Sequence, residues 1–413
     1  MTALEGAARV MARADELATH SSRTDGIERS YLTPEHARVN HIAGAWMREA
    51  GLTSWPDAAA NQCGRRTRDD DDRPAVLLGS HLDTVPGAGR YDGILGVLIA
   101  IEVADRLRDA ELPFALEVVA FGDEEGTRFG TTLLGSRALA GTWQPEWAEL
   151  VDSDGIHLAD AARTFGLDPE AIGTAARTRE SLVAYLEAHV EQGPRLEAHD
   201  RALGIVTSIA AAERRLITFT GEARHGATPW DLRRDALVGA AEAIVAVERI
   251  ARGQGSYATV GHIDVEPDAV NVIPGVARFT LDLRDATSTA RDATWGMIRH
   301  AVNQIAAERG LDVDVASTHA APEVTCAPAL QAAIGAGIRA AVSGAADTDP
   351  MELFSVAGHD AMAVAAITDV GMLFVRCAGG ISHSPDESVL EADVALAIDA
   401  LEAAVLELAR THS

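Results

Sequence analysis

The sequence predicts an α/β fold, with a largely parallel sheet covered by helices and an inserted, smaller α+β domain. Continuous apolar runs alternate with helically spaced runs in the first half of the chain and again after about residue 320. Between these regions the runs alternate apolar and polar side chains. The first pattern is typical of strands buried on both faces, and the second of strands with one face in water. We therefore expect one domain of residues 1–203 and 320–413 and an inserted domain of residues 204–319.

Each expected element has its own pattern in the sequence. In the larger domain the apolar runs predict strands over 75–81, 114–121 and 371–379, and helical spacing predicts helices over 94–107 and 389–409. In the inserted domain we expect strands over 214–223, 256–266 and 275–284 and helices near 234–252 and 286–309. The acidic run from Arg68 to Asp72 is expected to be a solvated loop.

Composition and charge exclude some classes of partner. The 413 residues are 47% hydrophobic, which allows a large core, and their formal net charge is −27. Such an acidic surface repels nucleic-acid phosphates and anionic lipids, so neither a nucleic acid nor a membrane is expected as a partner. The charge serves either solubility or a specific cationic partner. A small anionic substrate requires a local arginine or metal that reverses the field.

The compartment is predicted from cysteines and apolar segments. The three cysteines are scattered, form no CxxC unit and are odd in number, which argues against a disulfide framework. The first twenty residues form an amphipathic pattern without the features of an export signal, and no apolar run approaches membrane-spanning length. We expect a cytoplasmic protein.

Polar residues follow the expected strand over 75–81, where α/β proteins place their sites. His81 ends this strand, and Asp83 and Asp92 follow in a glycine-rich loop. A single histidine at a strand end is more often structural than a metal ligand. Asp83, however, can accept a hydrogen bond from the far ring nitrogen of His81, as the partners of metal-bound histidines do. Asp92 precedes a helix, where a carboxylate can cap the helix or bridge two cations.

Glu124 and Glu125 end the next expected strand. Two adjacent carboxylates repel each other and are costly to bury unless a cation compensates them. Because adjacent residues leaving a strand point in opposite directions, one can bind a metal while the other handles a proton. The pair could equally belong to an exposed acidic loop.

Two further histidines complete a possible ligand set. His189 lies before Gly193-Pro194, and His383 lies in a glycine-flanked loop after a core strand. Together with the carboxylates they form a nitrogen and oxygen set suited to zinc, manganese, cobalt or nickel. The spacing of the residues leaves open whether they converge.

Long motifs make the interpretation more specific. They read GSHLDTVPGAGRYDGILGVLIAIE, FGDEEGTRFGTTLLGSRALAG, YLEAHVEQGPRLEA, EPDAVNVIPGVARFTLDLRDA, SVAGHDAMA and GGISHSPDE. From about residue 20 to the C-terminus the chain resembles the amidase branch of the aminoacylase/carboxypeptidase-type dinuclear metallohydrolases. That branch includes allantoate amidohydrolase, N-carbamoyl-L-amino-acid hydrolase and β-ureidopropionase.

The resemblance implies a role for each residue. Two divalent metal ions per subunit would share Asp92. Zinc and manganese are the preferred candidates for these ions, and cobalt and nickel are the alternatives. His81 and His189 would complete one metal site, and Glu125 and His383 the other. Glu124 would be the catalytic base. The residues implied to bind the substrate are Gln192, His225, Asn271 and Arg284.

The resemblance also implies an activity and an assembly. We expect hydrolysis of a linear C–N bond in a small anionic ureido or carbamoyl acid, with release of ammonia and carbon dioxide. We further expect a homodimer formed through the inserted domain, which would act as a lid. The alternatives are an aminoacylase or dipeptidase acting on N-acyl amino acids, and a non-catalytic binding protein. Two segments depart from the family pattern: His225–Trp230, which is one residue shorter, and Ala211-Ala212.

Overall fold

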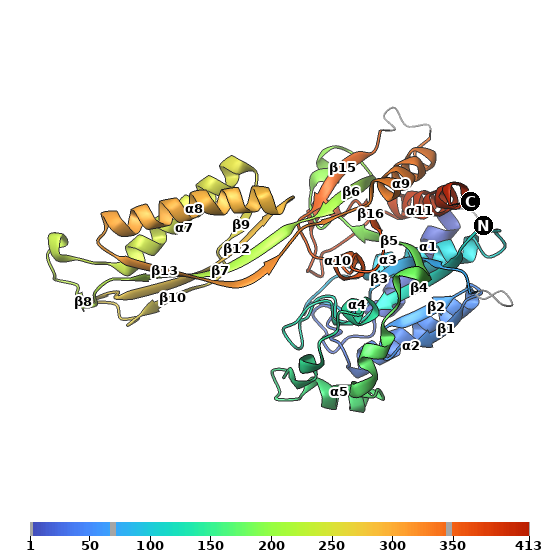
Figure 1. Cartoon of the computed structure of the whole chain (residues 1–413), viewed down its shortest axis with the longest axis horizontal. Coiled ribbons are helices and arrows are strands. Elements are labelled where there is room, and N and C mark those ends of the chain that lie inside the picture. Colours follow the sequence, from blue (N-terminus) through green and yellow to red (C-terminus); the bar gives the residue numbers. More distant parts are fainter. Residues whose placement is uncertain (1–2, 67–71, 344–348, 413) are drawn as a thin grey trace. The chain divides into compact units, whose positions relative to one another are not determined.

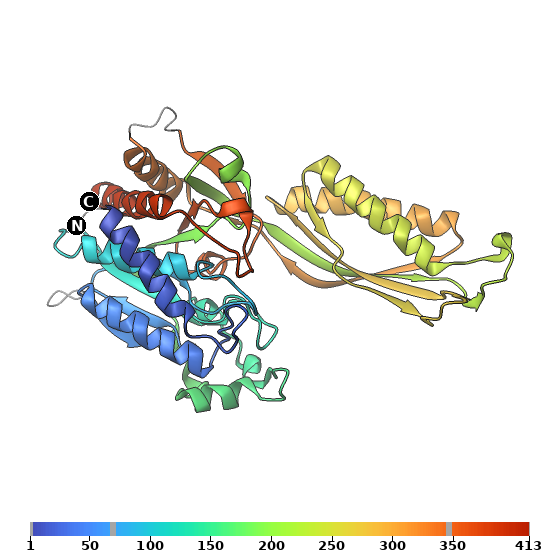
Figure 2. The ribbon, with the colours of Figure 1, turned by 180° about the vertical axis from the view of Figure 1, so that it is seen from behind.

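A computed structural model describes residues 3–66, 72–343 and 349–412 (Figures 1 and 2). The chain divides into two units, which are described separately. The first comprises Met1–Thr207, Thr325–Leu353 and Gly358–Ser413, and the second Ser208–Val324 and Phe354–Ala357. The predicted boundaries at 203/204 and 319/320 lie near these divisions. Residues 68–71 of the acidic run lie outside the described residues.

A mixed sheet forms the centre of the first unit. Its strand order is β1-β2-β4-β3-β5-β16-β6-β14, and β15 also pairs with β6. The four central strands β4, β3, β5 and β16 run parallel, whereas β1, β2 and β6 pair antiparallel at the two sides. The α/β class is therefore confirmed, with parallel pairing in the middle of the sheet. The strands are β1 (Thr53–Pro56), β2 (Gln62–Arg65), β3 (Ala75–His81), β4 (Ala115–Phe121), β5 (Leu182–Val190), β6 (Leu203–Ile209), β14 (Val324–Thr325), β15 (Met351–Ser355) and β16 (Val370–Val375).

Helices cover both faces of this sheet. One face packs against five helices in a continuous core that includes Val76, Leu116 and Leu186 from the central strands. The opposite side carries a smaller cluster around Tyr31, Leu134 and short helices. The helices of the unit are α1 (Ala3–Ala18), α2 (Pro34–Glu49), α3 (Ile94–Arg106), α4 (Leu134–Leu139), α5 (Leu158–Phe165), α6 (Arg195–Ala198), α9 (Pro328–Ala341), α10 (Ala361–Val364) and α11 (Glu391–Thr411). Among the described helices, none has the length and hydropathy needed to cross a membrane.

The close packing of β3 against β4 leads to a stability prediction. A Cβ atom on Gly79 would lie 2.0 Å from the Val119 carbonyl oxygen, and backbone in the middle of a sheet cannot move away. We expect Gly79→Ala to lower the free energy of unfolding by about 3 kcal/mol or more, as overpacked cores do. Denaturant unfolding measures this change. Gly253→Ala is the control, because that exposed position in α7 (Ala236–Gln254) has open space around it. Equal stabilities of the two variants would contradict the prediction.

The second unit is an antiparallel sheet with two helices packed on it. The strand order is β10-β12-β7-β13, and β9 also pairs with β12. α7 and α8 (Ser288–Glu308) bury one face of the sheet in a core that includes Phe219, Phe279 and Ile298. The strands are β7 (Ala211–Thr220), β9 (Tyr257–Thr259), β10 (Ile263–Glu266), β12 (Val276–Asp285) and β13 (Asp312–Ala321), and β8 (Arg224–His225) pairs separately with β11 (Val272–Ile273).

One predicted strand of this unit is divided in the structure. The sequence predicts one strand over 256–266, and the structure has β9 and β10, both paired with β12. Between them His262 exchanges hydrogen bonds with the backbone and hydroxyl of Thr280. The chain thus follows β12 throughout, and only the regular pairing is interrupted.

Candidate metal centre

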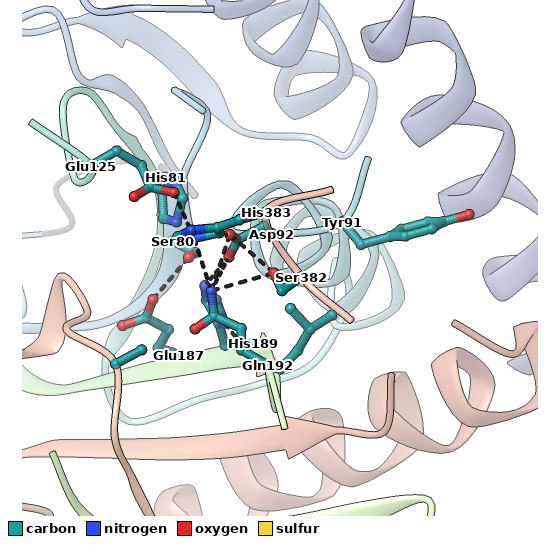
Figure 3. A network of polar contacts seen from close by, with 12 residues as sticks. Ser80, His81, Tyr91, Asp92, Glu125, Glu187, His189, Gln192, Ser382 and His383 are labelled. Atoms are coloured by element: carbon teal, nitrogen blue, oxygen red, sulfur yellow. Dashed lines mark hydrogen bonds and ion pairs between the residues drawn. The ribbon is translucent and has the colours of Figure 1, made fainter. Parts of the chain in front are cut away.

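The carboxyl ends of the parallel strands bring the predicted ligands together (Figure 3). His81 is the last residue of β3, and His189 is the penultimate residue of β5. Glu125 follows β4, Asp92 lies just before α3, and His383 lies in the loop between β16 and α11. Strands that run parallel end at one edge of a sheet, and this topology explains how residues so far apart in sequence converge.

Two groups of possible ligand atoms share Asp92. One group is His81, Asp92 and His189, and the other is Asp92, Glu125 and His383; within each group the ligand atoms lie within 4.8 Å of one another. His189 Nε2 is 3.3 Å from Asp92 Oδ1, and His383 Nε2 is 2.9 Å from Asp92 Oδ2. These are the two sets implied by the sequence resemblance, and they place Asp92 where it could bridge two cations.

The orientation of the buried histidines suits a cation. Nδ1 of His81 lies 3.0 Å from the Asp83 carbonyl oxygen, and Nδ1 of His189 lies 2.9 Å from the Val190 carbonyl oxygen. A carbonyl only accepts, so in both rings Nδ1 carries a proton, and Nε2 is the nitrogen whose lone pair can be offered to a cation in place of a second proton. Within the described part of the chain, no residue supplies a hydrogen-bond partner for the buried Nε2 of His189. A lone pair of this kind beside a carboxylate fits a divalent cation.

Asp83 makes a different contact from the one predicted. Its backbone carbonyl, not its carboxylate, is at hydrogen-bond distance from His81, since the carboxylate Oδ1 lies 3.6 Å away. The carboxylate accepts from the backbone nitrogens of Glu124 and Glu125, at 3.0 and 3.1 Å. Asp83 therefore holds the turn that presents the two glutamates as well as the ring of His81.

Gln192 contacts two of the three residues of the second ligand group, Asp92 and His383. Its Nε2 is 3.0 Å from each Asp92 carboxylate oxygen and 3.3 Å from His383 Nε2. The structure thus places the amide donor of Gln192 against the carboxylate of Asp92, whose negative charge also attracts a cation. The predicted contact of Gln192 with substrate remains a prediction.

The buried carboxylates change the protonation equilibria of the site. Burial and the neighbouring Glu125 carboxylate raise the pKa of Glu124 well above its usual value. Hydrogen bonds to Asp92 and Glu125 raise the pKa of His383 to about 10. Burial opposes charge on His81, but the surrounding carboxylates, Asp83 foremost, raise its pKa to about 9. Protons held by these side chains thus offset the negative charge of the buried carboxylates. A bound divalent cation can offset that negative charge instead.

Several buried polar residues of the site were not singled out from the sequence. Glu187 accepts hydrogen bonds from the Ser80 hydroxyl at 2.8 Å and the Ala361 nitrogen at 3.2 Å, and the His359 ring contacts the His189 ring at a centroid distance of 4.4 Å. Glu387 accepts hydrogen bonds from the loop that carries Asp92. A charged residue inside an apolar run is the signal that could have revealed Glu187, because it lies two residues before His189 and hence on the same face of β5.

The other predicted substrate contacts belong to the second unit. His225, on β8, pairs with Val272 of β11, next to Asn271. Arg284 lies on β12, where it donates to Asp282 at 2.7 Å and to the Val356 carbonyl at 2.9 Å. The shortened segment after His225 is held by Arg233, which donates to the carbonyls of Gly226 and Thr228. Their roles in substrate binding remain predictions.

Clustered histidine and carboxylate ligand atoms beside a buried glutamate, at the carboxyl edge of an α/β sheet, are an arrangement typical of metal-dependent hydrolases. The model of peptidase family M20/M25/M40 matches residues 77–407. The chain belongs to this family, and within it to the amidohydrolase branch, whose members act on C–N bonds other than peptide bonds.

Relatives match over nearly the whole chain. An N-carbamoyl-L-amino acid amidohydrolase from Geobacillus stearothermophilus is 40% identical over 389 residues, covering 93% of this chain and 94% of that protein. An allantoate deiminase from Arabidopsis thaliana is 38% identical over 417 residues, with 94% and 79% covered. The crystal structure of an amidase of the hydantoinase/carbamoylase family from Burkholderia multivorans superposes with a TM-score of 0.86 at 32% identity, covering 97% of each chain.

Proposed function

We propose that the chain hydrolyses the C–N bond of a small ureido or carbamoyl acid, either allantoate or an N-carbamoyl-L-amino acid, and releases ammonia and carbon dioxide. The observation that carries the proposal is the pair of ligand groups joined by Asp92, with Glu124 at their side. Relatives of 40% and 38% identity bear the names of these two activities. Two divalent cations would be held by His81, Asp92, Glu125, His189 and His383. Zinc and manganese are the preferred candidates, and cobalt and nickel are the alternatives.

Glu124 is the proposed general base. Bound divalent cations would acidify water and polarise the substrate carbonyl. Glu124 would take the proton of the attacking water and return it to the departing nitrogen. Its raised pKa suits both steps, because a more basic carboxylate accepts a proton more readily and the carboxyl group so formed can act as an acid. Asp83 supports the role through its hydrogen bond to the Glu124 nitrogen.

Ammonia release from protein reconstituted with Mn²⁺ or Zn²⁺ tests the proposal. The panel comprises allantoate, N-carbamoyl-L-amino acids, N-carbamoyl-β-alanine and N-acetyl-L-amino acids. We expect turnover of allantoate or a carbamoyl-L-amino acid, and a kcat/KM at least about 100-fold lower for the acetyl compounds, which lack the terminal ureido nitrogen. The assay also follows release of free amino acid, so that an aminoacylase is recognised. Activity confined to the acetyl compounds would overturn the ureido assignment.

We also propose that residues 204–319 form a lid and that two copies assemble through it. His225 and Asn271 lie at the end of the second unit where β12 begins, whereas Arg284 lies eight residues after Val276, near the other end. At strand spacing this separation is roughly 26 Å, which a small ureido acid cannot span. If both ends bind substrate, a second subunit must supply one of them. Arg284 would pair with the substrate carboxylate.

Mixing two inactive variants tests this assembly. We expect His225→Ala and Glu124→Gln each to lose activity alone. Subunit exchange of an equal mixture should restore about a quarter of wild-type activity, because half of the dimers then contain one intact site. A monomer in light scattering, or a mixture without recovery, would contradict the shared site.

The three free, buried cysteines support the further proposal of a cytoplasmic location.

A further inference from the structure

A buried carboxylate links the two loops that carry Asp92 and His383. Glu387 lies in the loop between β16 and α11 and is 4% exposed. Its Oε2 accepts hydrogen bonds from the backbone nitrogens of Tyr91 and Asp92, at 2.9 and 3.3 Å. Its Oε1 accepts from the Ser382 hydroxyl at 2.9 Å. One side chain thus contacts the backbone that leads into Asp92 and the residue that precedes His383.

The fit of this carboxylate against the Asp92 loop is close. A Cβ atom on Gly89 would lie 2.3 Å from Glu387 Oε2, so the absence of a side chain at Gly89 allows Glu387 to reach the loop. The Ser382 hydroxyl also lies 3.3 Å from Asp92 Oδ2. Ser382 therefore stands between Glu387 and the carboxylate shared by the two ligand groups.

His383 depends on its loop for its position. Its side chain is 47% exposed, whereas the side chains of His81 and His189 are 2% and 1% exposed. Its backbone φ of 55° lies in the left-handed region, which is unfavourable for a residue with a side chain. The surrounding structure has to maintain this conformation, and the contacts of Ser382 and Glu387 lie immediately around it.

We propose that Glu387 is a positioning residue for the metal centre. It fixes the distance between Asp92 and His383, two of the three ligands that would hold the second cation, and so sets the affinity of that cation. The inference rests on the metal centre proposed above. Hydrogen-bonded partners of metal ligands typically change metal affinity by about 10- to 100-fold when they are removed.

Calorimetric titration of the chelator-treated full-length chain with Mn²⁺ tests the proposal. The wild type is expected to bind two ions. Glu387→Ala should weaken by about 10- to 100-fold the ion that is lost in His383→Ala, and affect the other ion less. Glu387→Gln should recover most of the affinity, because its amide oxygen can still accept from both backbone nitrogens. Asp386→Asn changes an exposed neighbouring acid and should leave both affinities unchanged.

The outcomes separate a positioning role from a merely structural one. Thermal melting of each ion-free variant shows whether stability alone has changed. Weaker binding by Glu387→Ala with recovery by Glu387→Gln supports the proposal, whereas wild-type affinity in Glu387→Ala, or a Gln variant as weak as the Ala variant, overturns it. If Glu387→Ala does not fold, Ser382→Ala replaces it and should show a smaller loss at the same site; unchanged affinity there also overturns the proposal. A wild type that binds no ion overturns the metal centre itself.

Discussion

Glu124→Gln is expected to lower kcat by ~10²–10⁴-fold while both cations stay bound, because this range is what a positioned general base contributes. The amide has nearly the shape of the carboxylate and can still accept a hydrogen bond, but it cannot take a proton. The backbone nitrogen of residue 124 would keep its bond to Asp83. Steady-state ammonia release and metal content of the same preparation measure the two quantities.

Glu125→Gln is the matched comparison for this variant. Glu125 lies 3.4 Å from His383 and belongs to the second ligand group, so its change is expected to weaken cation binding as well as turnover. The adjacent glutamates should therefore separate into one variant that keeps its metal and one that does not. A Glu124→Gln protein with more than about a tenth of wild-type kcat would refute the role of Glu124 as base.

Much of the fold follows from local patterns in the sequence. The apolar run over 75–81 coincides with β3. The run over 114–121 begins one residue before β4 and ends with it. Both strands are buried on both faces, which is why their sequence shows no alternation. The antiparallel strands β1 and β2 at one side of the sheet were harder to predict from the sequence, because they are four-residue strands with few apolar side chains.

The candidate site could be predicted where sequence position fixes geometry. His81 ends one central parallel strand and Glu124 follows another, so the sheet brings them to one edge. Hydrogen bonds between loops are another matter, since no periodicity relates Glu387 to Tyr91, 296 residues away. The same limitation explains Asp83, whose carboxylate was predicted to reach His81 but holds the turn at Glu124. Which oxygen of a residue faces which partner depends on loop conformation.

Asp92→Ala is expected to remove both cations, because Asp92 is the one residue common to the two ligand groups. Loss of a hydrogen-bonded partner costs about 10- to 100-fold in metal affinity, so loss of the bridging ligand should cost more than about 100-fold for each ion. His189→Ala and His383→Ala remove a ligand from one group each, and each is expected to keep one ion. Metal content after dialysis, with circular dichroism as the check on folding, measures the pattern. An Asp92→Ala protein that retains one tightly bound ion would show that the two groups do not share a bridge. The ion would then be assigned to a group without Asp92, either His81, Glu124 and Glu125 or Glu187, His189 and His359, whose ligand atoms also converge within 4.8 Å.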